Sequence, residues 1–157
     1  MTREVIASRT PAGDDRRMET LHSIHSSNAG MRAERRLRGV LLANAAISAL
    51  AGSVALLAPV RLDELLGTGH PGLLRAVGIG LVAFAVEVLL VARSGRARLD
   101  SGTRLIVVAD AAWVVATAVT IAVGWYAPTG AVVMGVAGVG VADFAVAQHV
   151  LRRRLSR

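Results

Sequence analysis

Three carboxylates and one amide lie well inside the long apolar runs of this sequence, namely Glu87, Asp110, Asp143 and Asn44. A carboxylate inside a bilayer costs about 2.5–3.5 kcal/mol on insertion scales, so these groups should face other helices and be paired or protonated. Counted along ideal helices, each lies about 9–14 Å inside the arginine that bounds its run on one side. The spacing predicts one polar layer that crosses all four runs.

Two kinds of chemistry fit such a layer. The three acids could form a proton- or cation-linked site with Asn44 as hydrogen-bond partner, since neighbouring carboxylates retain a shared proton and suit proton relay. The alternative is a hydrogen-bonded latch that fixes helix register. The latch is favoured because the runs hold no second polar layer for a path across the membrane. Candidate supporting residues are Ser48, Trp113, Thr117, Gln148 and His149.

Other kinds of site find little support in the sequence. The chain has no cysteine, which excludes disulfides, thiolate metal sites and cysteine nucleophiles. His149 is the one histidine within the apolar runs, so haem held by two histidines lacks a second ligand, and the remaining histidines have no metal spacing. Gly78-x-Gly80 lies inside an apolar run and indicates helix packing, not dinucleotide binding. We therefore expect no enzyme, cofactor or metal.

Long apolar runs must position these polar groups. Hydrophobic residues make up 54% of the 157 residues and charged residues 18%, with a mean hydropathy of +0.53. A helix of about 20 apolar residues spans a bilayer, and turn residues separate four such runs. The sequence predicts an all-α polytopic membrane protein whose four-helix domain covers 31–157, with helices over about 39–58, 73–92, 105–127 and 130–151. The intervening segment 60–66 is short and amphipathic, which is typical of an interfacial turn.

The distribution of arginine predicts the orientation. All 18 cations are arginine, and they flank the apolar runs rather than forming a nucleic-acid surface. Most lie before the first run, between the second and third, and after the fourth, whereas the opposite side has only Arg61 and Arg75. By the positive-inside rule, both termini face the cytoplasm of a bacterial cell, in a multi-pass plasma-membrane protein.

The first 30 residues are polar and lack helical or strand periodicity, which predicts a disordered cytoplasmic segment. Met31 opens a more regular stretch and is a natural alternative start of translation. The first apolar run could also be read as a signal peptide cut after Ala51, but the run continues to Leu57 and favours a retained helix.

An internal repeat relates the two halves of the chain. The segment Arg38–Ala46 aligns with Arg104–Ala112, which makes Asn44 and Asp110 equivalent. Gly78–Val86 aligns likewise with Gly138–Val146, including the phenylalanine of each. The alignment predicts two tandem related hairpins that enter the membrane from the same side, with a pseudo-two-fold axis along its normal.

With these motifs assembled, residues 35–154 resemble small four-helix integral membrane proteins found widely in bacteria. The resemblance rests on Ala43-Asn44-Ala45, Leu73-Leu74-Arg75-x-x-Gly78-x-Gly80, Phe84-Ala85, Asp110-Ala-Ala-Trp113 and Phe144-Ala145-x-x-Gln148, followed by a basic end. It implies the fold and the membrane location and brings no activity with it. We expect a non-enzymatic membrane subunit or scaffold that acts through helix packing with itself or another membrane protein. The alternative is a small proton-coupled carrier or oligomeric channel that uses the carboxylate layer.

Overall fold

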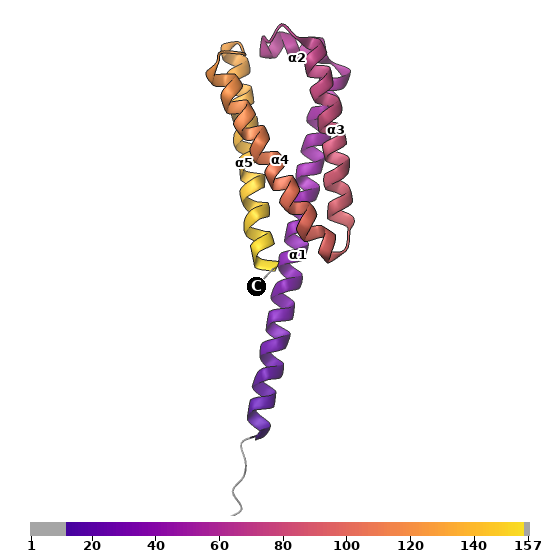
Figure 1. Cartoon of the computed structure of the whole chain (residues 1–157), viewed down its shortest axis with the longest axis vertical. Coiled ribbons are helices and arrows are strands. Elements are labelled where there is room, and N and C mark those ends of the chain that lie inside the picture. The colour runs from indigo at the N-terminus through magenta and orange to yellow at the C-terminus, as the bar shows by residue number, and fades with distance from the viewer. Residues whose placement is uncertain (1–11, 156–157) are drawn as a thin grey trace, which may run out of the picture.

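The computed structural model describes the backbone of residues 12–155 and the side chains of residues 30–154 (Figure 1). All regular structure in this part is helical: α1 Ala12–Leu57, α2 Pro59–Leu66, α3 Pro71–Arg93, α4 Arg96–Ala122 and α5 Pro128–Leu155. Four segments are long and apolar enough to span a membrane: Gly30–Leu57, Pro71–Arg93, Arg96–Ala122 and Pro128–Arg154. The all-α class and the four candidate spans are thus confirmed, and they are compatible with a multi-pass membrane protein.

The helix ends differ from those expected at two places. Helix α1 begins at Ala12 and continues to Leu57, and no proline lies between Pro11 and Pro59 to interrupt its hydrogen bonds. The backbone of residues 12–30 is part of this helix, residues 1–11 lie outside the described part, and disorder of segment 1–30 stays a prediction from the sequence. Helix α4 runs from Arg96 to Ala122 instead of 105–127. Gly124, with a φ of 71°, turns the chain before Pro128 is reached.

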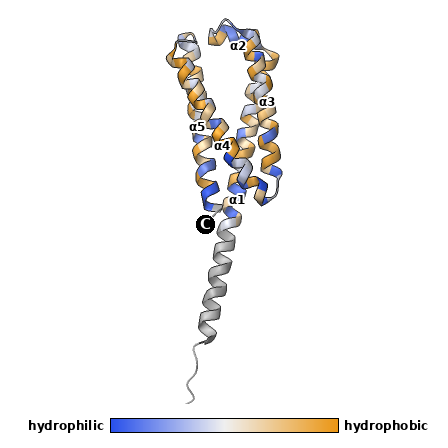
Figure 2. Ribbon diagram, viewed as in Figure 1, coloured by the Kyte–Doolittle hydropathy of each residue, from blue (hydrophilic) through white to orange (hydrophobic). Residues whose placement is uncertain are grey.

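The spans pack as two sequential pairs, α1 with α3 and α4 with α5, and α1 also contacts α5. The α3–α4 turn and the end of α5 lie at one end of the bundle, which we call the arginine end; α2 and the α4–α5 turn lie at the other, the α2 end (Figure 1). Figure 2 shows hydrophilic residues gathered at the arginine end and around α2, with mostly apolar helix between these two ends. This distribution is expected of helices surrounded by lipid.

The main apolar core lies toward the arginine end, where α1, α3 and α4 meet. Its buried members are Leu37, Leu41, Ala45, Val88, Val91, Ala92, Leu99 and Ile106. Arg38 completes this end of the bundle: its guanidinium donates to the carbonyls of Ala92 and, at 2.8 Å, Ser94, and it pairs with Glu34 at 2.9 Å. A cationic side chain thus satisfies carbonyls that the last turn of α3 leaves without helical donors.

Helices α1 and α3 approach each other closely where the backbone of Gly52 meets the backbone of Gly78. A Cβ added to Gly78 would lie 2.8 Å from the Gly52 carbonyl oxygen, and one added to Gly52 would lie 2.9 Å from the Gly78 oxygen. Neither position has room for a side chain. Small residues allow such close approach, which is a principal source of packing energy between membrane helices.

Helix α2 joins the two pairs at the α2 end. The Leu66 carbonyl accepts a hydrogen bond of 2.9 Å from the amide of Ala127. A Cβ on Gly130 would overlap the same oxygen, so α5 begins directly against the end of α2. Gly67 ends α2 with a φ of 67°. The segment predicted as an interfacial turn is therefore a helix that bridges the hairpins, with Leu66 buried.

The turn after α2 depends on Asp63. Its carboxylate accepts hydrogen bonds from the hydroxyl of Thr68 and, at 3.2 Å, the amide of His70. The Thr68 bond is the largest of the causes that hold the pKa of Asp63 below its ordinary value of 3.8. Since the bonds require the ionised form, their contribution to stability is complete above about pH 4 and is lost as the pH falls through the lower folded pKa.

We expect Thr68→Val to raise the pKa of Asp63 toward its ordinary value, because the hydroxyl donor is removed. The carboxyl-carbon NMR titration of Asp63 in nanodiscs measures the shift, and protection of the His70 amide from hydrogen exchange reports the turn itself. Thr68→Ser keeps the donor and is the matched control. Equal Asp63 titration in the parent chain and in Thr68→Val would contradict the assignment.

Candidate functional site

Three buried polar side chains meet at the centre of the bundle, one each from α1, α4 and α5. Asn44 donates from Nδ2 to Oδ2 of Asp110 at 2.9 Å, and Gln148 donates from Nε2 to the same oxygen at 3.4 Å. Their exposed fractions are 2% for Asn44, 3% for Asp110 and 0% for Gln148. We call these three residues the polar cluster. It links the first helix pair to the second.

The helical spacing of buried residues explains why Asn44 and Asp110 point inward. On α1, Leu37, Leu41 and Asn44 follow steps of four and three residues, and all are nearly fully buried. On α4, the buried residues Thr103, Ile106, Asp110 and Thr117 follow steps of three, four and seven. Such steps keep side chains on one helical face. Each polar residue therefore occupies a core position of its own helix.

The polar cluster has one acceptor atom without a hydrogen-bond donor, and no cationic side chain bonds to its carboxylate in the described part of the chain. Both described partners of Asp110 are neutral amides. The ion pairs of the described side chains include Arg38 with Glu34, Arg61 with Glu64, and Arg152 with Asp100, and none of these three pairs involves Asp110. Within the same part of the chain, Oε1 of Gln148 is buried without a hydrogen-bond partner. Buried polar groups are normally satisfied, so this cluster can accept a further donor.

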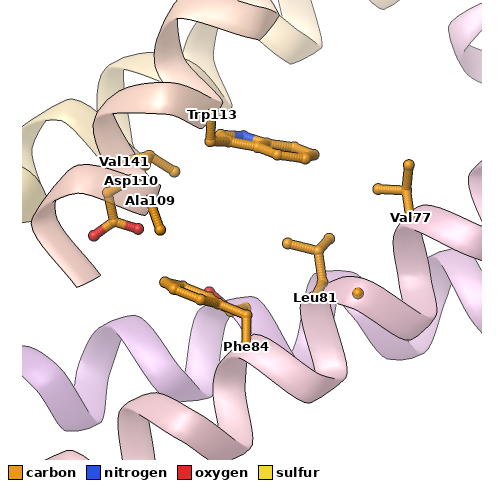
Figure 3. Close-up of a pocket in the computed structure, with 9 residues that line it drawn as sticks. Val77, Leu81, Phe84, Ala109, Asp110, Trp113 and Val141 are labelled. Atoms are coloured by element: carbon orange, nitrogen blue, oxygen red, sulfur yellow. The ribbon is translucent and has the colours of Figure 1, made fainter. Parts of the chain in front are cut away.

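A cavity of about 320 Å³ adjoins the cluster and lies between the two helix pairs. Figure 3 shows Asp110 and Trp113 of α4 on one side of it and Leu81 and Phe84 of α3 on the other. Ser48 also lines the cavity and its hydroxyl donates to Oδ1 of Asn44 at 3.4 Å. The remaining lining residues are Val77, Gly80, Ala109 and Val141. The cavity is thus apolar, with one carboxylate, one hydroxyl and one indole.

The other two predicted acids do not join Asp110. Glu87 lies on an exposed face of α3 and Asp143 on an exposed face of α5. Neither has a hydrogen bond or ion pair among the side chains of residues 30–154. Asp143 lies five residues from Gln148, which is about 140° around an α-helix, so burial of one excludes burial of the other. The structure therefore separates the predicted layer into an internal cluster and two external carboxylates.

The supporting residues fall into two groups. Ser48 and Trp113 line the cavity, and Gln148 is part of the polar cluster. Thr117 is buried between α4 and α5. A Cβ on Gly138 would lie 3.5 Å from the methyl group of Thr117, so Thr117 contributes to the packing of α5 on α4. His149 is half-buried next to Gln148. The described residues contain no group of three side chains suited to hold a metal ion.

One buried polar residue was not singled out by its sequence pattern. Thr103 is fully buried, and its hydroxyl donates to the Leu99 carbonyl at 2.6 Å. Thr103 lies seven residues before Asp110 and therefore on the same face of α4. This spacing is the feature of the sequence that could have predicted its burial. Because its hydroxyl is satisfied within its own helix, Thr103 contributes to packing and not to the cavity.

Comparison with protein-family models, curated proteins and solved structures finds no match to this chain. The resemblance to small bacterial four-helix membrane proteins accordingly rests on the residue motifs alone.

Proposed function

We propose that the chain is a non-enzymatic subunit or scaffold of the bacterial plasma membrane that acts through contacts between helices. The main support is the exposure of Glu87 and Asp143 on α3 and α5, within candidate spans and without partners among the described side chains. Facing acyl chains would cost each carboxylate about 2.5–3.5 kcal/mol. A helix of another membrane protein, or of a second copy, that supplies a donor or a cation would remove this cost.

The orientation in this proposal has both termini in the cytoplasm. It is supported by the arginines that flank the arginine end, Arg38, Arg93, Arg96 and 152–154 among them, against Arg61 and Arg75 at the other end. Positively charged residues near span ends are retained on the cytoplasmic side. Glu87 and Asp143 would then lie in the cytoplasmic half of the bilayer, where a partner would meet them.

The tandem relationship of the two hairpins forms part of the same proposal. Its support is the bond between Asn44 and Asp110, which the sequence alignment makes equivalent. Residues related by a two-fold axis contact one another when they lie close to that axis. In both hairpins, moreover, the aligned glycines Gly78 and Gly138 pack against the preceding span.

A second candidate function, a small proton-coupled carrier or channel, is favoured by one observation, the cavity that Asp110 lines. Its weakness is the position of Glu87 and Asp143 outside that cavity. A relay that includes all three acids would need a second copy to bring the external carboxylates together.

Purification of the tagged full-length chain from native membranes in mild detergent tests the subunit role. We expect a partner or a homodimer to copurify with the parent chain, and Glu87→Gln and Asp143→Asn to reduce its yield about tenfold, the equivalent of 1.4 kcal/mol. Chain abundance should stay unchanged. Glu64→Gln, a carboxylate change in α2 outside the candidate spans, is the control.

Two results would overturn the subunit role. One is a chain that runs as a monomer without any copurifying protein. The other is retention of assembly in both acid variants together with loss of proton flux in reconstituted vesicles, which would establish the carrier instead. If the copurifying species is the chain itself, the subunit is a homo-oligomer.

A further inference from the structure

The cavity between the helix pairs has the size and lining of a small-molecule site. Its volume of about 320 Å³ falls within the range of natural ligand pockets, which are mostly apolar with a few placed polar groups. Here the placed groups are the carboxylate of Asp110, the hydroxyl of Ser48 and the indole of Trp113. We propose that this cavity binds a small organic cation, a protonated amine with an apolar body, with Asp110 as its counter-charge.

The burial and the hydrogen-bond partners of Asp110 support a cationic ligand. This side chain is 3% exposed, and both amides that donate to it use the same oxygen, Oδ2. An ionised carboxylate that is buried is normally paired with a cation, whereas the described partners of Asp110 are neutral. A ligand ammonium in the cavity would supply both the missing charge and additional hydrogen-bond donors. An anionic ligand would be repelled from the same position.

The aromatic residues favour the same ligand class. Figure 3 shows the rings of Trp113 and Phe84 on opposite sides of the cavity, with the carboxylate of Asp110 at one end between them. Cations are attracted to the faces of aromatic rings, most strongly to that of tryptophan. Farther from the carboxylate, Val77 and Leu81 offer apolar contacts to the body of the ligand. The arrangement therefore suits an amine attached to a single ring or a short branched chain.

This site goes beyond the proposed subunit role and does not depend on it. Ligand binding is measured on the purified chain, whereas the subunit role is measured by copurification, so either can fail alone. The external carboxylates Glu87 and Asp143 take no part in the binding site.

Fluorescence of Trp113 in lipid nanodiscs provides the test. The chain has two tryptophans, and Trp125 packs against His70 with ring centroids 5.8 Å apart, so a Trp125→Phe background isolates Trp113. The probes are benzylamine and its neutral analogue benzyl alcohol, titrated at pH 7 against empty nanodiscs as blank. We expect a saturable change with benzylamine and a dissociation constant about tenfold higher, or more, for benzyl alcohol.

Two variants test whether the preference for the charged probe comes from Asp110. Asp110→Asn keeps an oxygen for the Asn44 amide but loses the charge, so the preference for benzylamine should disappear. Glu64→Gln removes an acid in α2 that lies outside the cavity, and it should leave both dissociation constants within about twofold of the parent values. Equal affinity of the parent chain for the two probes, no saturable change with either, or equal weakening by both variants would overturn the proposal. If Asp110→Asn does not fold, the comparison of probes on the parent chain decides the question.

Discussion

Gly78→Ala is expected to destabilise the helical bundle by about 1–3 kcal/mol, the usual cost of overpacking a close contact. The added methyl group would lie 2.8 Å from both the Gly52 oxygen and the Leu56 nitrogen. Both are backbone atoms of α1, so no flexible side chain can move aside, and the α1–α3 pair must separate. Because this pair also holds Asn44 in position, the polar cluster should loosen with it.

Gly80→Ala is the matched control on the same helix. Nothing lies within 4 Å of a Cβ at Gly80, and alanine is favoured over glycine in a helix by about 0.8–1.0 kcal/mol. This variant should therefore be neutral or slightly more stable. Steric-trapping or thermal unfolding measurements in one detergent compare the stability of the parent chain, Gly78→Ala and Gly80→Ala. Equal stability of the two variants would show that α1 and α3 do not pack at these glycines.

The second large effect is expected at the polar cluster, in a double-mutant cycle of Asn44→Ala and Asp110→Ala. Each single change leaves a buried group without its partner at 2.9 Å and should cost about 1–3 kcal/mol. The double variant removes both groups, so it should lose less than the sum of the two. Polar pairs between membrane helices have coupling energies of about 0.6 kcal/mol on average and at most about 1.7.

A second cycle with Thr103→Ala in place of Asp110→Ala provides the control. Thr103 is equally buried on α4, but its hydroxyl bonds to Leu99 within the helix. Its coupling to Asn44 should therefore be close to zero. Denaturant unfolding of all variants in detergent measures both cycles. A coupling energy between Asn44 and Asp110 no larger than that of the control would mean that the latch contributes nothing to helix register.

The sequence by itself determined the helical class and the four spans, because bilayer thickness sets the length of an apolar run and the runs are separated by glycine, proline and charge. It also indicated that Asp110 faces other helices, because a carboxylate exposed to lipid costs free energy. These features depend only on residue type and on position along the chain.

Only the tertiary structure decided how α3 and α5 are rotated. Both helices consist mainly of alanine, valine, leucine and glycine, so their faces differ little in hydropathy and their few polar residues do not reveal which face is buried. Contact between Gly52 and Gly78 turns Ala85 and Val88 inward and leaves Glu87 outside. On α5, the buried position went to Gln148 instead of Asp143, because Gln148 can donate to Asp110 whereas a second carboxylate would repel it. The sequence indicates how deep each polar residue lies along its helix, which is why one polar layer was expected. Packing decides how each helix is rotated about its axis, and it leaves only Asn44, Asp110 and Gln148 in one internal cluster.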